Sequence, residues 1–373
     1  MTNSKHVPKR RFSGFEEAWY LIALEEIAKI TMGQSPNGET YSDTPNDYIL
    51  VQGNADLVEG WVKPRLWTTQ VTKRADKGDI IMSVRAPAGE VGRTNYDVVI
   101  GRGVAAIKGN DFIFQRLIKM NLDGYWKSLS AGSTFESLNS DDIKRAIFKI
   151  PSIHEQEYIG RFFETLDSFI SLHQHKLDKL KNLKKAYLSE MFPAEGERVP
   201  KRRFPGFEGE WEQKKLGEIL ETVSYKEFMK EPQSSGDFEV IQQGHDSIIG
   251  FADGIPCNDF EDVVIFGDHT LSLYKPKNPF FVATDGVRIL KGKNSMNGYY
   301  LYVLLDRFKP KSEGYKRYFG ILTNVELSMT NNIAEQEKIA LLFQQIDKSI
   351  ELQQQKLDKL NDLKKAYLNE LFV

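Results

Sequence analysis

Two 40-residue stretches of this 373-residue chain are near copies of each other and decide its fold. The first, residues 153–192, is IHEQEYIGRFFETLDSFISLHQHKLDKLKNLKKAYLSEMF, and the second, residues 333–372, is IAEQEKIALLFQQIDKSIELQQQKLDKLNDLKKAYLNELF. They are identical at 23 of 40 positions, at an offset of 180 residues. A repeat of this length predicts two copies of one structural unit in a single chain.

Both stretches carry apolar residues at alternating spacings of three and four, which is typical of a coiled-coil helix. Polar residues interrupt this seam at His173 and Lys184, matched by Gln353 and Lys364, and such residues often fix the register or the partner of a helix. The apolar seam consists of Phe163, Leu166, Ile170, Leu177, Leu180, Tyr187 and Met191, and of Ile339, Phe343, Ile346, Ile350, Leu357, Leu360, Tyr367 and Leu371. One such helix would be ~55 Å long at ~1.5 Å per residue. We predict that the two helices pair, most simply antiparallel, and act as a spacer.

A second repeat lies elsewhere in the chain: VPKRRFSGFEEAW at 7–19 returns as VPKRRFPGFEGEW at 199–211. The regions between the repeats differ, apart from faint echoes such as Gln52-Gly53 with Gln243-Gly244, and GVAAIKG (103–109) with GVRILKG (286–292). The chain is therefore predicted to contain a first mixed domain (1–150), a first helix (151–194), a second mixed domain (195–332) and a second helix (333–373).

The divergent regions hold short β-branched and aromatic runs bounded by Gly, Pro, Asn and Asp, which predict strands. Strands are expected at 48–51, 79–84, 98–100, 263–266 and 280–283, and helices at 112–122 and 296–305. The predicted fold class is α+β, with two mixed α/β domains and two long helices that pair as an antiparallel coiled coil.

The composition is that of a globular protein, with 40% hydrophobic and 27% charged residues, which argues against a collagenous, disordered or membrane identity. No run approaches the ~18 apolar residues of a membrane span, and the start of the chain lacks the apolar stretch of a secretory signal. The lone Cys257 cannot form an internal disulfide or a Cys-rich zinc site, so a cytoplasmic location is expected. The net charge of −2 means that any contact with nucleic acid must be local.

The chain lacks the motifs that would make it an enzyme. GRGVAA (101–106) fits the letters of a dinucleotide fingerprint, but a strand-like run follows it where the motif needs a helix. His173 and His175 are two residues apart and face different sides of a helix, so no metal site is expected. The sequence contains no Pro-Pro, and the Asn/Asp-Pro-Pro-aromatic motif of adenine methyltransferases is therefore absent. Neither catalytic nor metal-binding residues are expected.

Three further signatures complete the pattern: GSTFESLN at 132–139, a strand ending at Ile150-Pro151, and Glu155-Gln156 at the start of the long helix. Together with the repeats, they resemble the specificity subunits of type I restriction-modification systems over nearly the whole chain. The second copy departs from the first by having Asn331 where Pro151 stands, although it keeps Glu335-Gln336.

The resemblance implies two target-recognition domains that read the halves of an asymmetric target in double-stranded DNA. It also implies helices that set the gap between the halves and dock two modification (methyltransferase) subunits, which restriction subunits would join. S-adenosylmethionine, ATP and Mg would be bound by those partners for adenine methylation and DNA cleavage. No cofactor is expected on this chain itself.

Candidate DNA contacts are Arg and Lys, which suit guanine, and Asn and Gln, which suit adenine, near predicted turns. For any single residue, a solvated or phosphate-facing side chain is the alternative. The densest basic patch is DRFKPKSEGYKRYFG (306–320), where basic residues alternate with aromatic ones. The candidates are Gln52, Asn54, Lys73, Arg74, Arg85, Arg93 and Arg102 in the first domain, and Gln243, His245, Arg288, Lys316, Arg317 and Tyr318 in the second.

Residues repeated near the ends of both helices are candidate docking points for the partner subunits: Lys184, Lys185, Tyr187, Lys364, Lys365 and Tyr367. Core packing is the alternative for the two tyrosines, and the VPKRRF segments either touch phosphate or brace the helices. A stand-alone DNA-binding regulator is a second candidate function, although as a dimer it would need a symmetric target. A coiled-coil scaffold is a third, and it would show no salt-dependent affinity for DNA.

Overall fold

The computed structural model describes residues 7–45, 47–130 and 137–373, and the chain forms two compact units. Unit 1 comprises the chain up to Gln174 together with Gln355–Val373, and unit 2 comprises His175–Gln354. The units follow packing rather than chain order, because each combines one mixed domain with parts of both long helices. Of the GSTFESLN run, residues 132–136 lie outside the described residues.

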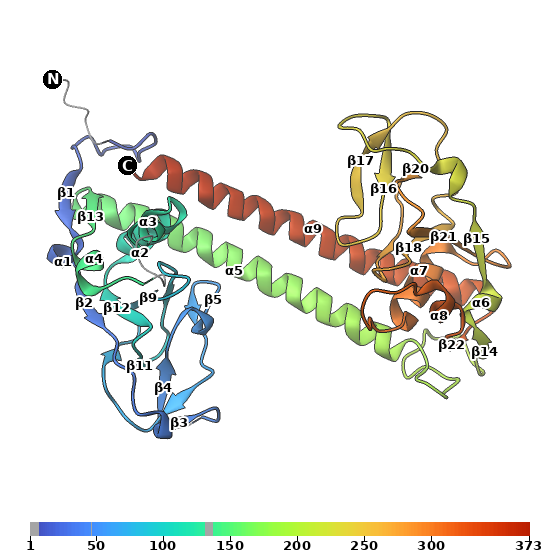
Figure 1. Ribbon diagram of the computed structural model, residues 1–373, viewed down its shortest axis with the longest axis horizontal. Helices are drawn as coiled ribbons and strands as arrows, with labels where there is room; N and C mark the ends of the chain where they lie inside the picture. The colour runs from blue at the N-terminus through green and yellow to red at the C-terminus, as the bar shows by residue number, and fades with distance from the viewer. Residues whose placement is uncertain (1–6, 46, 131–136) are drawn as a thin grey trace. The chain divides into compact units, whose positions relative to one another are not determined.

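The described residues of unit 1 form three sheets, whose strands can be followed in Figure 1. The six-stranded sheet has the order β2 (Lys29–Met32), β12 (Val104–Lys108), β9 (Ile80–Ser83), β10 (Val91–Arg93), β6 (Trp61–Val62) and β5 (Leu57–Val58). The five-stranded sheet has the order β3 (Tyr41–Ser42), β7 (Trp67–Thr68), β4 (Tyr48–Val51), β11 (Val98–Ile100) and β8 (Arg74–Ala75), with β4 and β11 parallel. The third sheet pairs β1 (Tyr20–Ala23) with β13 (Ile147–Ile150).

Unit 2 repeats this framework with fewer strands. Its four-stranded sheet has the order β15 (Leu220–Val223), β21 (Val287–Gly292), β18 (Val263–Gly267) and β19 (Leu273–Tyr274). Its three-stranded sheet has the order β17 (Ile248–Ala252), β16 (Phe238–Ile241) and β20 (Phe280–Val282), with β16 and β20 parallel. β14 (Glu212–Lys215) pairs with β22 (Glu326–Met329) as β1 pairs with β13. The two divergent regions therefore share one fold.

The short helices occupy matching places in the two units. Asparagine side chains start the longest of them: Asn110 Oδ1 accepts the Ile113 amide at 3.0 Å, and Asn297 Oδ1 accepts the Tyr299 amide at 2.9 Å. Unit 1 has α1 (Leu24–Ile27), α2 (Asp111–Leu122), α3 (Tyr125–Ser130) and α4 (Ser140–Lys144), and unit 2 has α6 (Leu216–Ile219), α7 (Gly298–Phe308) and α8 (Phe319–Thr323). The predicted helices and strands are confirmed to within a few residues, because their apolar runs are bounded by strong turn and capping residues.

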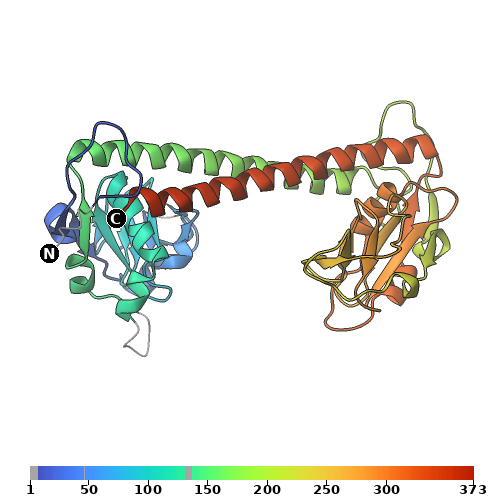
Figure 2. The same cartoon turned by 90° about the horizontal axis from the view of Figure 1, so that it is seen from above.

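The two long helices are α5 (Ile153–Glu190) and α9 (Ile333–Leu371). In unit 1 the end of α9 lies beside the start of α5, with the rings of Phe162 and Tyr367 4.9 Å apart (Figure 2). In unit 2 the end of α5 lies beside the start of α9, with the rings of Phe192 and Phe343 6.3 Å apart. Residue numbers rise along one helix as they fall along the other, so the pairing is antiparallel in each unit, as predicted.

Both lysines of the heptad seam form ion pairs that fix this register. Lys364 Nζ lies 2.6 Å from Asp167 Oδ1 in unit 1, and Lys184 Nζ lies 2.8 Å from Asp347 Oδ1 in unit 2. The two pairs are equivalent under the 180-residue repeat. Because a shifted register would leave these charges half-buried and unpaired, it would be disfavoured. No helix in the described part of the chain is long and apolar enough to span a membrane.

Candidate nucleic-acid interface and helix clasp

Four of the seven candidate DNA contacts of unit 1 gather where parallel strands β4 and β11 end. Gln52 follows β4, and the Gly101 amide donates to the Val51 carbonyl at 2.8 Å, which brings Arg102 to the same edge. The Ile100 amide donates to the Lys73 carbonyl at 2.9 Å, so Lys73 joins them. Asn54, two residues after Gln52, begins the 3-10 turn Asn54–Asp56. Four predicted contacts thus meet at one sheet edge.

A buried carboxylate that the sequence analysis missed organises this edge. Asp56 is 2% exposed, and its Oδ2 accepts the backbone amides of Gln52 at 2.6 Å and of Gly53 at 3.2 Å. Its other oxygen accepts a hydrogen bond from Arg65 Nε. Asp56 therefore holds in place the backbone that carries Gln52 and Asn54.

Of the remaining three candidates of unit 1, Arg85 and Arg74 lie near this edge, whereas Arg93 lies elsewhere. The Val84 amide donates to the Gly103 carbonyl at 2.9 Å, which places the exposed Arg85 near the edge. Arg74 lies on β8 with its guanidinium 4.9 Å from the Tyr48 ring. Arg93 lies on β10, at the end of the six-stranded sheet that is away from Val84 and Gly103. Its Nη2 donates to Asp111 Oδ1 at 2.6 Å, so the structure gives Arg93 an intramolecular partner on α2.

The corresponding edge of unit 2 lies where β16 and β20 end. Gln243 follows β16, and its Oε1 accepts the His269 amide at 3.0 Å. Asp268, which is 1% exposed, accepts the Phe319 amide at 2.8 Å and the Arg288 guanidinium at 3.2 Å. Asp268 therefore attaches the basic segment around residue 317 to the edge that carries Gln243.

Within that basic segment the predicted contacts have different surroundings. Tyr318 is fully buried, and its hydroxyl donates to the Gly314 carbonyl at 2.7 Å, so its placement supports a role in folding the segment rather than in touching DNA. Arg317 is exposed. Lys316 Nζ donates to Glu313 Oε2 at 2.5 Å, and this hydrogen bond raises the pKa of Lys316.

Two aromatic side chains add a flat surface beside these residues. The rings of His269 and Tyr315 stack with centroids 4.8 Å apart and planes 6° from parallel, although Tyr315 is 88% exposed. Exposed rings of this kind suit stacking on nucleic-acid bases. His245, a predicted DNA contact, is exposed, and its Nδ1 lies 3.2 Å from Asp246 Oδ1. The sequence carried no signal for His269, because its place depends on contacts with segments far along the chain.

The predicted docking points lie near the ends of the two helices and differ in exposure. Lys184 and Lys364 are held in the ion pairs described above, whereas Lys185 and Lys365 are exposed. Tyr187 and Tyr367 are partly buried and pack against the core of unit 2 and of unit 1, respectively. These placements leave Lys185 and Lys365 as the more accessible of the six.

The VPKRRF repeat braces the helices in both units through two adjacent arginines. Arg11 binds the buried Glu155 of α5 with Nε–Oε1 and Nη2–Oε2 distances of 2.7 and 2.6 Å, while Arg10 pairs with Glu370 of α9 at 2.5 Å. In unit 2, Arg203 binds Glu335 at 2.6 and 2.9 Å, and Arg202 pairs with Glu190 at 2.6 Å. Each repeat thus clasps the start of one long helix and the end of the other.

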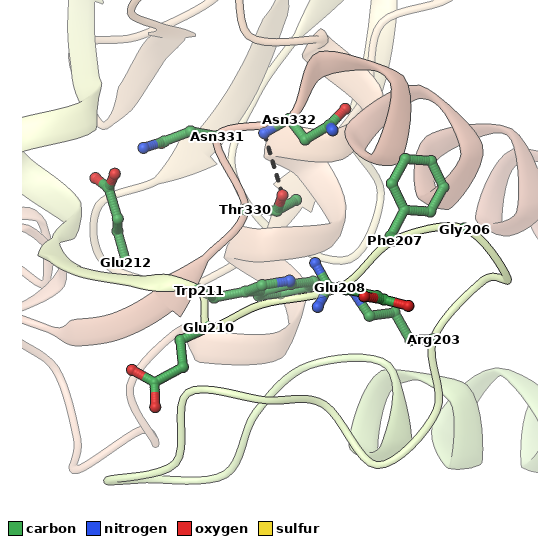
Figure 3. Close-up of a pocket in the computed structure, with 10 residues that line it drawn as sticks. All are labelled: Arg203, Gly206, Phe207, Glu208, Glu210, Trp211, Glu212, Thr330, Asn331 and Asn332. Atoms are coloured by element: carbon green, nitrogen blue, oxygen red, sulfur yellow. Dashed lines mark hydrogen bonds between the residues drawn. The ribbon is translucent and has the colours of Figure 1, made fainter.

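Figure 3 shows a pocket of unit 2 that lies beside the clasp and is lined by Arg203 and Trp211, among other residues. Its volume is about 250 Å³. The Arg203 guanidinium lies 6.0 Å from the centre of the Trp211 ring, and Trp211 packs against Phe192, two residues after the end of α5. Trp19 occupies the same place in unit 1 and packs against Phe372, which directly follows α9. Across residues 7–45, 47–130 and 137–373, no group of His, Cys, Asp or Glu side chains is placed to hold a metal ion.

Comparison with known proteins places this arrangement in a family. The model of the type I restriction modification DNA specificity domain matches residues 16–182 and 208–362. These ranges cover most of the chain and both units, and the chain belongs to this family.

Two relatives are specificity subunits of type I restriction enzymes from Methanocaldococcus jannaschii. The MjaX subunit is 29% identical over 195 residues, which cover 50% of this chain and 45% of that protein. The MjaIX subunit is 23% identical over 299 residues, which cover 70% of this chain and 65% of that protein. The chain therefore matches from under half to just under two thirds of the length of these relatives.

Among solved structures, the S subunit of the type I restriction-modification system from M. genitalium is similar to this chain. The TM-score is 0.72 at 17% sequence identity, and the match covers 98% of this chain and 99% of that one. At this identity the likeness shows a shared fold, and it agrees with two mixed domains and two long helices.

Proposed function

We propose that this protein is the DNA-specificity subunit of a type I restriction-modification complex and is not itself catalytic. The observation that carries the proposal is the matched pair of polar sheet edges, at β4/β11 and at β16/β20, in a chain of the specificity family. Each edge presents Gln, Arg or Lys side chains of the kinds that discriminate bases in the major groove. Because the side chains of the two edges differ, each unit would recognise a different half-site.

The long helices would set the gap between the half-sites and dock the partner subunits. Two modification subunits would carry S-adenosylmethionine and methylate adenine, and restriction subunits with ATP and Mg would cleave DNA. The exposed Lys185 and Lys365, at equivalent places in the repeat, support docking at two equivalent sites. Because the proposed substrate is the DNA inside the cell, the complex would act in the cytoplasm.

The test is single-molecule sequencing of adenine methylation across the genome of a host that carries the matching modification subunit, with this gene present and deleted. A split, asymmetric motif methylated only when the gene is present is the expected result, and it would define both half-sites and the gap. A methylated motif that is continuous or palindromic would contradict two unlike recognition domains. If no motif changes although the protein co-purifies with the modification subunit, the specificity role is refuted.

A further inference from the structure

We infer that Asp167 and Asp347 are positioning residues that fix how each recognition domain is held against the helix pair, and thereby restrict the gap accepted between the half-sites. The inference rests on the proposed function. Asp167 lies on α5 and Asp347 on α9, at equivalent places in the 180-residue repeat. In its own unit, each aspartate joins three helices: the long helix that carries it, the other long helix, and the longest short helix of the mixed domain.

The joint of unit 2 is built from three polar ties. Lys184 Nζ of α5 lies 2.8 Å from Asp347 Oδ1, and the Tyr299 hydroxyl of α7 donates to Asp347 Oδ2 at 2.8 Å. Lys184 Nζ also lies 3.6 Å from Asp306 Oδ2, near the other end of α7. Since α7 packs on β18, β19 and β21, a tie at each end of this helix holds the whole sheet in place.

The charges of this joint are well suited to hold one geometry. Burial by itself lowers the pKa of Lys184, but Tyr302, Asp347 and Asp306 together raise it above its ordinary value. Burial and the Asp347 carboxylate raise the pKa of Tyr299, so its hydroxyl remains a donor at neutral pH. Charge-assisted hydrogen bonds in a partly buried place are directional, whereas apolar packing tolerates small rotations.

The joint of unit 1 uses two polar ties and a close steric fit. Lys364 Nζ lies 2.6 Å from Asp167 Oδ1, and Gln115 Nε2 of α2 donates to Asp167 Oδ2 at 2.8 Å. The helix α5 also passes close to α2 at Gly160, where an added Cβ would lie 2.9 Å from the Cβ of Asp111. Unit 1 is therefore held partly by steric fit, so loss of the Asp167 carboxylate should reduce the preference for the native gap less than loss of the Asp347 carboxylate.

The experiment uses the full chain assembled with its modification subunits and a plasmid library that carries the native half-sites. The gap in the library varies from two base pairs shorter to two base pairs longer than the native gap. Asp347→Asn should reduce the preference for the native gap over its nearest neighbours about fivefold, since one charge-assisted interaction is lost. Tyr299→Phe should reduce the preference about twofold, and Asp167→Asn by less than Asp347→Asn. The bases recognised in each half-site should not change.

Matched controls are Glu337→Gln on α9 and Glu164→Gln on α5, which remove the same charge from exposed positions of the same helices. These variants should keep the native gap preference. A purely structural role would lower stability and yield of the complex while leaving gap preference intact, and that result in both Asp347→Asn and Tyr299→Phe would overturn the inference. A changed base within a half-site would overturn it as well.

Two outcomes separate this inference from the proposed function. If Asp347→Asn fails to assemble, the conservative Tyr299→Phe variant decides the matter, because it removes only one hydroxyl. If the wild-type complex methylates no bipartite target at all, the proposed function fails and the inference fails with it. A wild-type bipartite target with unaltered gap preference in the variants refutes the inference alone.

Discussion

The two-stranded sheets β1/β13 and β14/β22 have the same antiparallel strand pairing and differ in the side chains that they expose. Tyr20 and Leu21 of β1 are 52% and 56% exposed, and Glu212 and Gln213 stand at the matching positions of β14. The clasp beside each sheet is the same in both units, with Arg11–Glu155 in one and Arg203–Glu335 in the other. The repeat thus preserves the contacts that hold a unit together, while the exposed surfaces diverge.

The largest expected effect is loss of a clasp arginine. Arg203→Ala would leave Glu335 buried and unpaired, which should lower the free energy of unfolding by about 3–5 kcal/mol. Arg11→Ala should have a similar effect, because Glu155 is equally buried. Chemical denaturation followed by circular dichroism measures both.

Arg198→Ala serves as the control for the clasp, since Arg198 and its partner Glu210 are largely exposed. It should change the free energy of unfolding by no more than about 1 kcal/mol. If one clasp variant lost little stability and the other lost several kcal/mol, the clasps of the two units would not be equivalent.

The next largest effect on stability is expected from replacing one glycine at each polar sheet edge, Gly103 in unit 1 and Gly286 in unit 2. An added Cβ at Gly103 would lie 2.0 Å from the Gln52 carbonyl oxygen, which belongs to the backbone and cannot move aside. At Gly286 the nearest atom, at 2.3 Å, is Nε2 of the Gln243 side chain, which can rotate. Gly103→Ala should therefore lower the free energy of unfolding by about 2–3 kcal/mol, and Gly286→Ala by about 1 kcal/mol. Thermal unfolding of both variants checks this order, and a larger loss for Gly286→Ala would contradict it.

Replacing Lys316 and Arg317 together with Ala should weaken DNA binding about tenfold and reduce the slope of log affinity against log salt by about one to two. The matched control is Lys201→Ala with Lys215→Ala, which removes two exposed cations of unit 2 from the clasp side. Fluorescence anisotropy over a range of salt concentrations makes the comparison. Equal salt slopes for the wild type and the 316/317 variant would remove this segment from the interface.

The smallest effect is expected where the two units differ most visibly. Tyr20→Glu with Leu21→Gln gives the outer face of β1 the residues of β14, and since both side chains are more than half exposed, the free energy of unfolding should change by less than about 0.5 kcal/mol. Urea denaturation measures the change. A loss of several kcal/mol would mean that this face is part of the unit 1 core.

Local patterns predicted the strands and helices well. The runs at 48–51 and 98–100 are strands β4 and β11 with the same bounds, and residues 112–122 lie in α2. The candidate site was only partly predictable, because residue type does not say what a side chain will meet. Arg93 looked like Arg102, yet Arg93 is held by Asp111 at the far end of its sheet.

The buried acids Asp56 and Asp268 escaped prediction for the same reason. An isolated aspartate near a turn is common on protein surfaces, and nothing local distinguishes one that will be buried. Each acquires its role only when segments distant in the chain meet around it, as when Asp268 accepts the amide of Phe319, 51 residues away.

Sequence patterns alone were enough to predict the repeat, the two heptad helices, their polar seam positions and the class of the mixed domains. These follow from periodicity and local propensity, which act over a few residues. Three features could be seen only in the folded chain: adjacent arginines clasp two helices, Asp167 and Asp347 each join three helices, and particular polar side chains reach the edges of the parallel strands. Those outcomes depend on long-range packing, in which a buried charge is tolerated only where a distant partner arrives to satisfy it.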